Sequence, residues 1–391
     1  MPVINRIAAF HEDMIAWRQD IHRNPETAFE EHRTAETVAR HLEGFGLEVH
    51  RGLAGTGVVA TLRAGKGSRA IALRADLDAL HIQEKNALPY ASCVPGKMHA
   101  CGHDGHTAML LGAARYLAET RRFDGTVHFV FQPAEENEGG GRVMVEQGLF
   151  DKFPCEAVYG MHNMPGMAVG AFAIRPGPMM ASYDVFEITV EGRGSHGAMP
   201  HQSIDPVVIA AQIVLGLQTI VSRNVKPLDA AVVSVTQIHG GDTWNVIPET
   251  VVLRGTTRCF RREVRDQMEQ RIGEIARGVA AAMGATATIR YERRYPALVN
   301  EQDAVRRAVA VASEVVGDPD RVVAEAEPVM GSEDFAFMLE KKPGAYIMIG
   351  NGGGEGGRML HNARYDFNDA ILPIGASYWA RLVETSLAAA G

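Results

Sequence analysis

The segment from residue 97 to residue 106 carries side chains that could bind a metal ion. Eight consecutive residues of this segment include three histidines, one cysteine and one aspartate, and two glycines make the backbone flexible. Cys101 and His103 offer a thiolate and an imidazole from one tight turn, and zinc-like ions prefer these donors. The alternative is a polar loop that leads into a helix. Further donors elsewhere in the chain would favour the metal-binding interpretation.

Such donors follow predicted strands. Glu135 and Glu136 come directly after a buried strand predicted over 126–131. His162 ends a strand predicted around 158–161, and His361 follows the glycine-rich segment 350–357, which we expect to lie beside the site. Ligand sites of open α/β sheets gather beyond the carboxyl ends of the strands. Segments far apart in the sequence can therefore meet there.

The number of donors indicates two ions. Cys101, His103, Glu136, His162 and His361 are more donors than a single four-coordinate ion needs. A bridging thiolate and a shared water complete two coordination shells, and the shared water becomes the nucleophile. Adjacent residues at a strand end point in opposite directions. Glu136 can therefore bind metal while Glu135 takes the proton from the water and passes it to a leaving nitrogen. The alternative for this acidic pair is a solvated surface turn.

Strands alternate with helices in the first half of the chain, which predicts a largely parallel α/β sheet. The pattern changes near residue 181 to β-α-β-β-α-β, the arrangement of a four-stranded antiparallel sheet with two helices on one face. The α/β alternation returns near residue 297. We therefore predict a discontinuous catalytic domain over 1–181 and 297–391, interrupted by an inserted α+β domain over 182–296.

The bulk composition excludes several classes of protein. The net charge of −8 argues against nucleic-acid or acidic-membrane partners. No apolar run is expected to approach the ~18 residues of a membrane span. Four scattered cysteines do not form a disulfide scaffold, and the N-terminus does not resemble a signal peptide. We expect a cytoplasmic protein.

Six short motifs lie along the chain. They are RADLDAL at residue 74, MHACGHDGH at 98, QPAEE at 132, GMHN at 160, GSHGAMPH at 194 and GSEDF at 331. Together they resemble one enzyme family, the aminoacylase/carboxypeptidase G-type metallopeptidases. Its branch of N-acyl-amino-acid amidohydrolases, which includes hippurate hydrolases, is the most similar. The resemblance extends from about residue 22 to about residue 369.

The resemblance implies two divalent ions in the catalytic domain. It assigns Glu136 and His361 to one ion and His103 and His162 to the other, with Cys101 as the bridge. Many relatives carry His-x-Asp where this chain has Asp76-Leu77-Asp78. Asp78 is therefore expected to contact a ligand and not a metal. A thiolate favours zinc, cobalt or nickel, whereas this branch is often linked to manganese.

The resemblance also implies that the inserted domain is a lid that forms a homodimer. His196 would come from the lid of the partner subunit to stabilise the oxyanion; a turn histidine is the alternative. Asn245 and Arg258 match positions near the acyl or carboxylate end of the substrate. An arginine fork suits a carboxylate, although Arg258 could equally be a surface charge at the end of a strand.

The sequence thus predicts a metal-dependent amidohydrolase. It would hydrolyse the linear amide bond of a small N-acyl amino acid and release a carboxylic acid and a free amino acid. A dipeptidase or an acetyl-diaminopimelate-type deacetylase on the same fold is the alternative. A non-catalytic metal-binding protein is disfavoured because both Glu135 and the metal donors are present.

Overall fold

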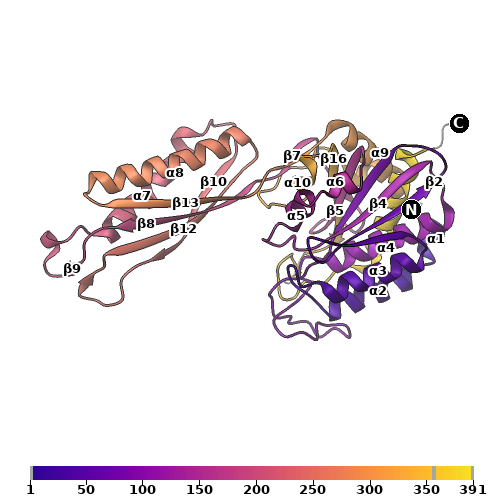
Figure 1. Ribbon diagram of the computed structural model, residues 1–391, viewed down its shortest axis with the longest axis horizontal. Helices are drawn as coiled ribbons and strands as arrows, with labels where there is room; N and C mark the ends of the chain where they lie inside the picture. Colours follow the sequence, from indigo (N-terminus) through magenta and orange to yellow (C-terminus); the bar gives the residue numbers. More distant parts are fainter. Residues whose placement is uncertain (1–2, 355–357, 389–391) are drawn as a thin grey trace. The chain divides into compact units, whose positions relative to one another are not determined.

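The computed structural model describes residues 3–354 and 358–388 (Figure 1). The described residues divide into two compact units. The first unit consists of Met1–Met179, Val299–Glu327 and Asp334–Gly391, and the second of Met180–Leu298 and Pro328–Glu333. Residues 355–357 of the predicted glycine-rich segment lie outside the described residues.

Within the described part of the first unit, eight strands form one sheet in the order β1-β2-β4-β3-β5-β16-β6-β15. The central strands β4, β3, β5 and β16 are mutually parallel, and β1 and β2 add antiparallel strands at one edge. The prediction of a mainly parallel sheet is confirmed. The strands are β1 (Glu48–Leu53), β2 (Gly57–Ala64), β3 (Ala70–Asp76), β4 (Gly125–Gln132), β5 (Ala157–Pro165), β6 (Phe172–Ala173), β15 (Val322–Val323) and β16 (Gly344–Gly352).

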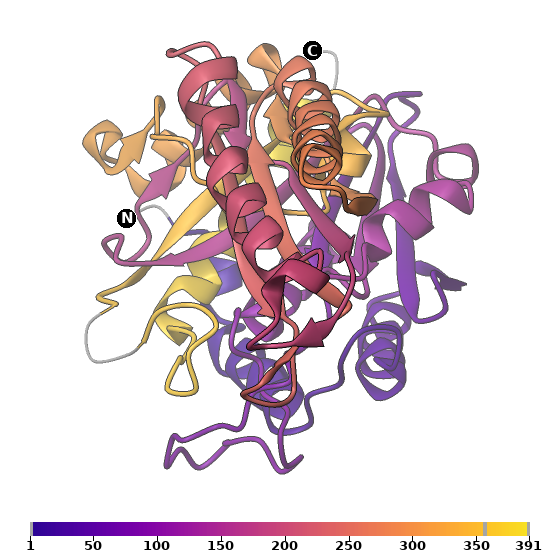
Figure 2. The same ribbon diagram turned by 90° about the vertical axis from the view of Figure 1, so that its left-hand side faces the viewer.

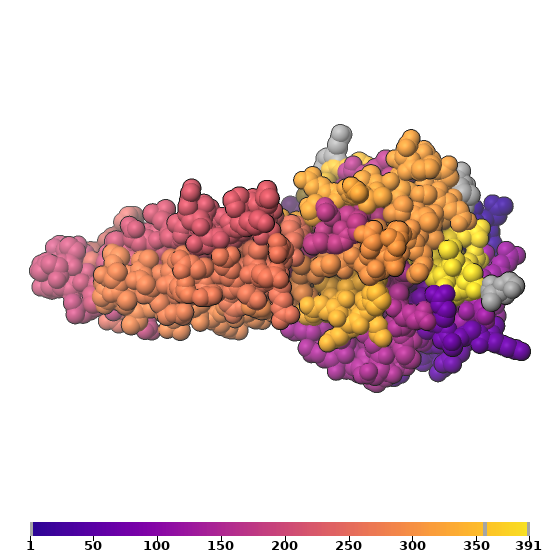
Figure 3. All heavy atoms as spheres, turned by 90° about the horizontal axis from the view of Figure 1, so that it is seen from above, coloured from indigo at the N-terminus to yellow at the C-terminus, as the bar shows by residue number. Residues whose placement is uncertain are grey.

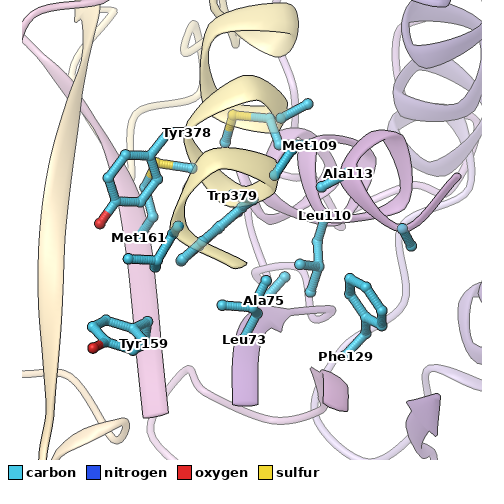
Figure 4. Close-up of a cluster of buried hydrophobic side chains, with 14 of the residues drawn as sticks. Leu73, Ala75, Met109, Leu110, Ala113, Phe129, Tyr159, Met161, Tyr378 and Trp379 are labelled. Atoms are coloured by element: carbon cyan, nitrogen blue, oxygen red, sulfur yellow. The ribbon is translucent and has the colours of Figure 1, made fainter. Parts of the chain in front are cut away.

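The core of the first unit lies between this sheet and two buried helices, α4 and α11. In Figure 4, Met109 and Leu110 of α4 and Trp379 of α11 lie over Leu73 and Phe129 of the sheet. Strand β3 is buried along almost its whole length, as its continuous apolar run predicts. The helices of this unit are α1 (Asn5–Ala8), α2 (His11–Arg23), α3 (His32–Gly44), α4 (His103–Thr120), α5 (Gly140–Glu146), α6 (Leu149–Lys152), α9 (Gln302–Val316), α10 (Ala336–Leu339) and α11 (Leu372–Ser386).

All residues of the second unit are described, and four of its strands form an antiparallel sheet in the order β10-β12-β8-β13. Helices α7 and α8 lie side by side over this sheet in Figure 2, and Figure 3 shows the same segments as one continuous surface. The predicted β-α-β-β-α-β order is confirmed. The elements are β8 (Tyr183–Glu191), β9 (Ser195–His196), α7 (Pro206–Thr219), β10 (Ala231–His239), β11 (Val246–Ile247), β12 (Thr250–Cys259), α8 (Arg262–Ala282) and β13 (Thr286–Tyr295).

The observed units differ from the expected boundaries by two residues at each junction and by one further segment. The sequence predicts that all of 297–391 lies in the catalytic domain, but Pro328–Glu333 belongs to the second unit. The reason is a short backbone pairing. The N–H of Ala181 donates to the carbonyl oxygens of Val329 and Gly331 at 3.1 and 2.9 Å. Sequence periodicity carries no signal for such a short, isolated pairing.

Helix α7 and the turn after it correct a second expectation. The stretch Pro206–Asn224 has 19 residues and a mean hydropathy of 1.5, so it meets the length and composition of a membrane span. One face of α7 packs on the sheet through Ile209, Ile213 and Leu217, as the core helix of a globular domain does. Its opposite face leaves apolar side chains exposed, among them Leu215 with 65% of its surface accessible.

Candidate metal centre

The first unit brings the predicted metal donors together. The Sγ atom of Cys101 lies 3.3 Å from Nε2 of His162. Donor atoms of Cys101, His103 and His162 all lie within 4.8 Å of one another. Helix α4 begins at His103, so Cys101 lies in the turn before it, while His162 lies inside β5 and not after it. All three side chains are buried.

A second group of donors shares the same cysteine. Donor atoms of Cys101, Glu136 and His361 also lie within 4.8 Å of one another, and Nε2 of His361 is 3.0 Å from Oε1 of Glu136. The backbone N–H of His361 donates to the carbonyl oxygen of Ala100 at 2.8 Å, which holds this loop against the cysteine turn. The two groups therefore overlap at one thiol.

Hydrogen bonds fix the orientation of both buried histidines. Nδ1 of His103 lies 3.2 Å from Oδ1 of Asp78, and Nδ1 of His162 donates to the carbonyl oxygen of Asn163 at 2.6 Å. Each ring therefore turns Nε2 towards the other donors. Among the described residues, Nε2 of His103 is buried and has no hydrogen-bond partner. Metal-binding histidines have this arrangement, in which the second nitrogen is held by a carboxylate or a carbonyl.

Asp78 connects the two donor loops. Its Oδ1 faces His103, and its Oδ2 accepts the backbone N–H of Glu136 at 2.9 Å. The side chain is fully buried. Asp78 thus contacts a histidine donor and the backbone of a carboxylate donor, so one side chain sets the positions of both groups.

The charges of the site favour cations. Burial raises the pKa of the Cys101 thiol well above its usual value, and the carboxylates of Glu136 and Glu135 raise it further. Burial lowers the pKa of His103, but Asp76 and Asp78 outweigh this effect and raise the pKa to about 10. Without a cation, the cysteine is therefore a thiol and the site attracts positive charge. A divalent ion would favour the thiolate, so the donor set fits a pair of such ions.

A second layer of polar residues, which the sequence did not identify, supports the cysteine turn. The carboxylate of Asp76 lies 2.6 Å from Nδ1 of His106, whose Nε2 accepts the backbone N–H of Asn163 at 3.0 Å. The Asn163 amide donates to the carbonyl oxygen of Cys101 at 2.6 Å. Asn163 directly follows a donor histidine, and that adjacency was the available signal.

The cysteine turn requires glycine at position 102. Gly102 has φ of +93°, a conformation that other residues rarely adopt. A Cβ atom there would lie 2.3 Å from Nδ2 of Asn163 and 2.5 Å from the hydroxyl of Tyr365. The close approach of these supporting side chains to the turn therefore depends on the absence of a side chain.

Glu135 lies beside the metal donors but belongs to neither of the two groups that contain Cys101. Glu135 is 7% exposed. A carboxylate oxygen of Glu135 and the donor atoms of His103 and Glu136 all lie within 4.8 Å of one another. The preceding Ala134 has φ of +53°, and its N–H donates to Glu31 at 2.9 Å. This tight turn after β4 turns the two adjacent glutamates to different surroundings.

The second unit carries the other predicted site residues. Strand β9 ends at His196, which pairs with Val246 of β11, next to Asn245. The N–H of Gly197 donates to the carbonyl oxygen of Asn245 at 2.6 Å. His196 and Asn245 are therefore neighbours at an exposed two-stranded antiparallel sheet. Arg258, at the end of β12, is half-buried and lies on another part of this unit.

Comparison with known proteins shows the family. The model of peptidase family M20/M25/M40 matches residues 72–385. The chain is 43% identical to hippurate hydrolase of Campylobacter jejuni, covering 93% of this chain and 94% of the relative. It is 40% identical to N-acetylcysteine deacetylase of Bacillus subtilis, covering 96% and 97%. The solved YXEP protein of Bacillus subtilis, described as a dinuclear metal-binding peptidase of the M20 family, has a TM-score of 0.84 at 37% identity, covering 97% and 99%.

The fold, the donor groups and these relatives define an amidohydrolase, and the predicted class of enzyme is confirmed. The chain belongs to peptidase family M20/M25/M40.

Proposed function

We propose that this enzyme hydrolyses the amide bond of small N-acyl amino acids and releases a carboxylic acid and a free amino acid. One observation carries the proposal: two donor groups share Cys101, and Glu135 lies beside them. The similarity to a hippurate hydrolase and to an N-acetylcysteine deacetylase supports an acyl group on the amino nitrogen of an amino acid.

In this proposal His103 and His162 would hold one divalent ion, Glu136 and His361 would hold a second, and Cys101 would serve both. Such ions would polarise the amide carbonyl and lower the pKa of the attacking water. Thiolate and imidazole donors suit zinc, cobalt or nickel, and the carboxylate is compatible with manganese.

Glu135 moves the proton in this proposal. Its carboxylate takes a proton from the attacking water and delivers it to the amide nitrogen as the carbon–nitrogen bond breaks. The buried position of Glu135 next to the donors supports this role, because a general base must reach the water directly.

Arg258 is proposed to bind the substrate carboxylate. Its guanidinium donates to Ser332 Oγ at 3.1 Å and lies 4.2 Å from the centre of the Tyr183 ring. It borders a cavity of about 440 Å³ on the sheet face of the second unit. A planar guanidinium in a partly desolvated position suits a carboxylate. The pKa of Arg258 is lowered by burial, so pairing with an anion would be favourable.

We further propose that the enzyme is a homodimer in which His196 and Asn245 act in the site of the partner. His196 is exposed, and Trp244, beside Asn245, is fully accessible. Strand β10 is an edge strand, and α7 exposes Leu215, so both offer surfaces for a second copy. Leu215→Glu is expected to give monomers in sedimentation velocity and to lower turnover; a variant that remains dimeric would contradict this interface.

A cytoplasmic location is also part of the proposal. The cysteines, all within the described residues, are free thiols. A reducing compartment preserves free thiols, including that of Cys101.

The central experiment is Glu135→Gln. This variant is expected to keep both metal equivalents, measured by elemental analysis, and to lose nearly all turnover, because the amide cannot accept the proton. More than a tenth of the original activity would exclude Glu135 as the base. A panel of hippurate, N-acetyl amino acids and dipeptides then defines the acyl group. Preference for dipeptides or for an acetylated diaminopimelate would replace the N-acyl-amino-acid assignment.

A further inference from the structure

A buried arginine, Arg74, contacts residues on both sides of the loop that carries Glu135. Arg74 is on β3, and its side chain is fully buried. Nη1 donates to Asp76 at 2.6 Å, Nη2 donates to Asp334 at 3.0 Å, and Nε donates to Gln132 at 2.9 Å. One guanidinium thus holds two buried carboxylates. Its planar fork allows this geometry, which a lysine ammonium could not reproduce.

The two carboxylates face different parts of the site. Asp76 bonds to His106 and lies 3.8 Å from Nε2 of His103, so it belongs to the side of the metal donors. Asp334 belongs to the side of the proposed base. Its backbone N–H points to Oε1 of Glu135 at 3.4 Å.

Asp334 is held by more than the arginine. Nε2 of Gln132 donates to Oδ1 and Oδ2 of Asp334 at 2.8 and 2.9 Å. The backbone N–H of Gly141 donates to Oδ2 at 2.7 Å. These donors come from the end of β4 and the start of α5, the two elements on either side of the Glu135 loop. The side chain of Asp334 is fully buried. The carboxylate therefore fixes the backbone of residue 334 relative to the loop.

A purely structural ion pair would not need this placement. Buried charges persist when they are paired and hydrogen-bonded, and that alone would account for Arg74 and Asp334. The Arg74–Asp334 pair, however, also links Gln132 at the end of β4 to residue 334. The backbone N–H of residue 334 is the group that contacts Glu135. A displacement of about 1 Å in a reacting group can lower a rate about 100-fold. The contact is long here, and catalytic hydrogen bonds often tighten only in the substrate complex.

We infer that Asp334, held by Arg74 and Gln132, is a positioning residue that aims the Glu135 carboxylate at the attacking water. The inference rests on the proposed role of Glu135 as the base. It assigns a catalytic purpose to the GSEDF motif, which contributes no metal donor to the two groups that share Cys101.

The test is a double-mutant cycle with Asp334→Asn and Glu135→Gln. The asparagine amide must face one of the donors that now bond to the carboxylate, so residue 334 shifts. Asp334→Asn is expected to lower kcat 10- to 100-fold per metal-loaded site while KM stays within twofold. In the Glu135→Gln background the same change is expected to alter the residual turnover by less than twofold, because no base remains to be aimed.

A matched control is Asp184→Asn in the second unit. Asp184 is also fully buried and is paired with Arg265 at 2.5 Å. This variant is expected to lower the melting temperature and leave kcat within twofold. If Asp334→Asn lowers turnover by the same factor in both backgrounds, or leaves kcat unchanged, the inference is overturned.

Arg74→Lys decides the question if Asp334→Asn does not fold. The lysine keeps the charge but cannot hold Gln132 and both carboxylates at once, and it is expected to give the same non-additive loss of kcat with Glu135→Gln. Equal factors in both backgrounds would again refute the inference. The single variant Glu135→Gln separates the two ideas: if it remains active, the proposed function fails, whereas if it is inactive and Asp334→Asn is fully active, only the positioning role fails.

Discussion

Replacing Asp78 by alanine tests how the two donor loops are held together. The carboxylate faces Nδ1 of His103 at 3.2 Å and accepts the N–H of Glu136 at 2.9 Å. Asp78→Ala removes both contacts while leaving every proposed metal donor in place. Loss of such a supporting contact typically weakens metal binding 10- to 100-fold, which corresponds to about 1.4–2.8 kcal/mol. Because Asp78 contacts one donor from each proposed ion, both ions should bind more weakly.

The measurement is metal affinity by competition with a chromogenic chelator, followed for the first and the second equivalent. Asp124→Ala is the matched control. Asp124 also accepts two backbone N–H groups, from Lys66 and Gly67, both at 2.6 Å. It precedes β4, at the end of that strand opposite to Glu135. Asp124→Ala should leave both affinities unchanged. If Asp78→Ala binds both equivalents within threefold of the original protein, the supporting role of Asp78 is refuted.

Three further predictions follow from individual residues. Gly102→Ala should lose metal and destabilise the fold by about 1–3 kcal/mol in denaturant titrations, since it combines a strained backbone with contacts to Asn163 and Tyr365; normal metal content would contradict this. Burial lowers the pKa of His128 to about 4, so the neutral ring stabilises the fold fully above pH 6.5. The free energy of unfolding should fall by about 3 kcal/mol as the pH drops from 6.5 towards 4 and the unfolded state gains the proton first. A His128→Gln variant whose free energy of unfolding depends equally steeply on pH would exclude His128 as the cause. Arg258→Ala should lower kcat/KM about 100-fold for hippurate and little for its amide; equal losses would remove the carboxylate contact.

Much of the fold could be read from periodicity. The apolar run of β3 predicts a strand buried on both faces, and the structure buries it. The order β-α-β-β-α-β predicts a four-stranded antiparallel sheet, and β10, β12, β8 and β13 form it. Periodicity was less informative where other contacts decide the conformation. Strand β5, predicted around 158–161, continues through His162 because it pairs with β16.

Part of the candidate site could also be predicted from the sequence. Residue types predicted Cys101, His103, Glu136, His162 and His361 as metal donors, because few other roles require such side chains together, and the structure brings these side chains close to one another. Of the supporting residues only Asp78 was predicted, and that prediction came from the family resemblance. Aspartate and arginine are common in every chain, so their presence carries no signal until burial makes an unpaired charge costly.

The sequence by itself determined the chemistry that is available, namely which metal donors and which acidic side chains exist. Only the tertiary structure decided that Cys101 belongs to two donor groups and that Asp78 contacts both. It also decided that Arg74 joins Asp76 to Asp334. The physical reason is that side-chain type is local, whereas distances between segments far apart in the chain depend on how the parallel strands order themselves in the sheet.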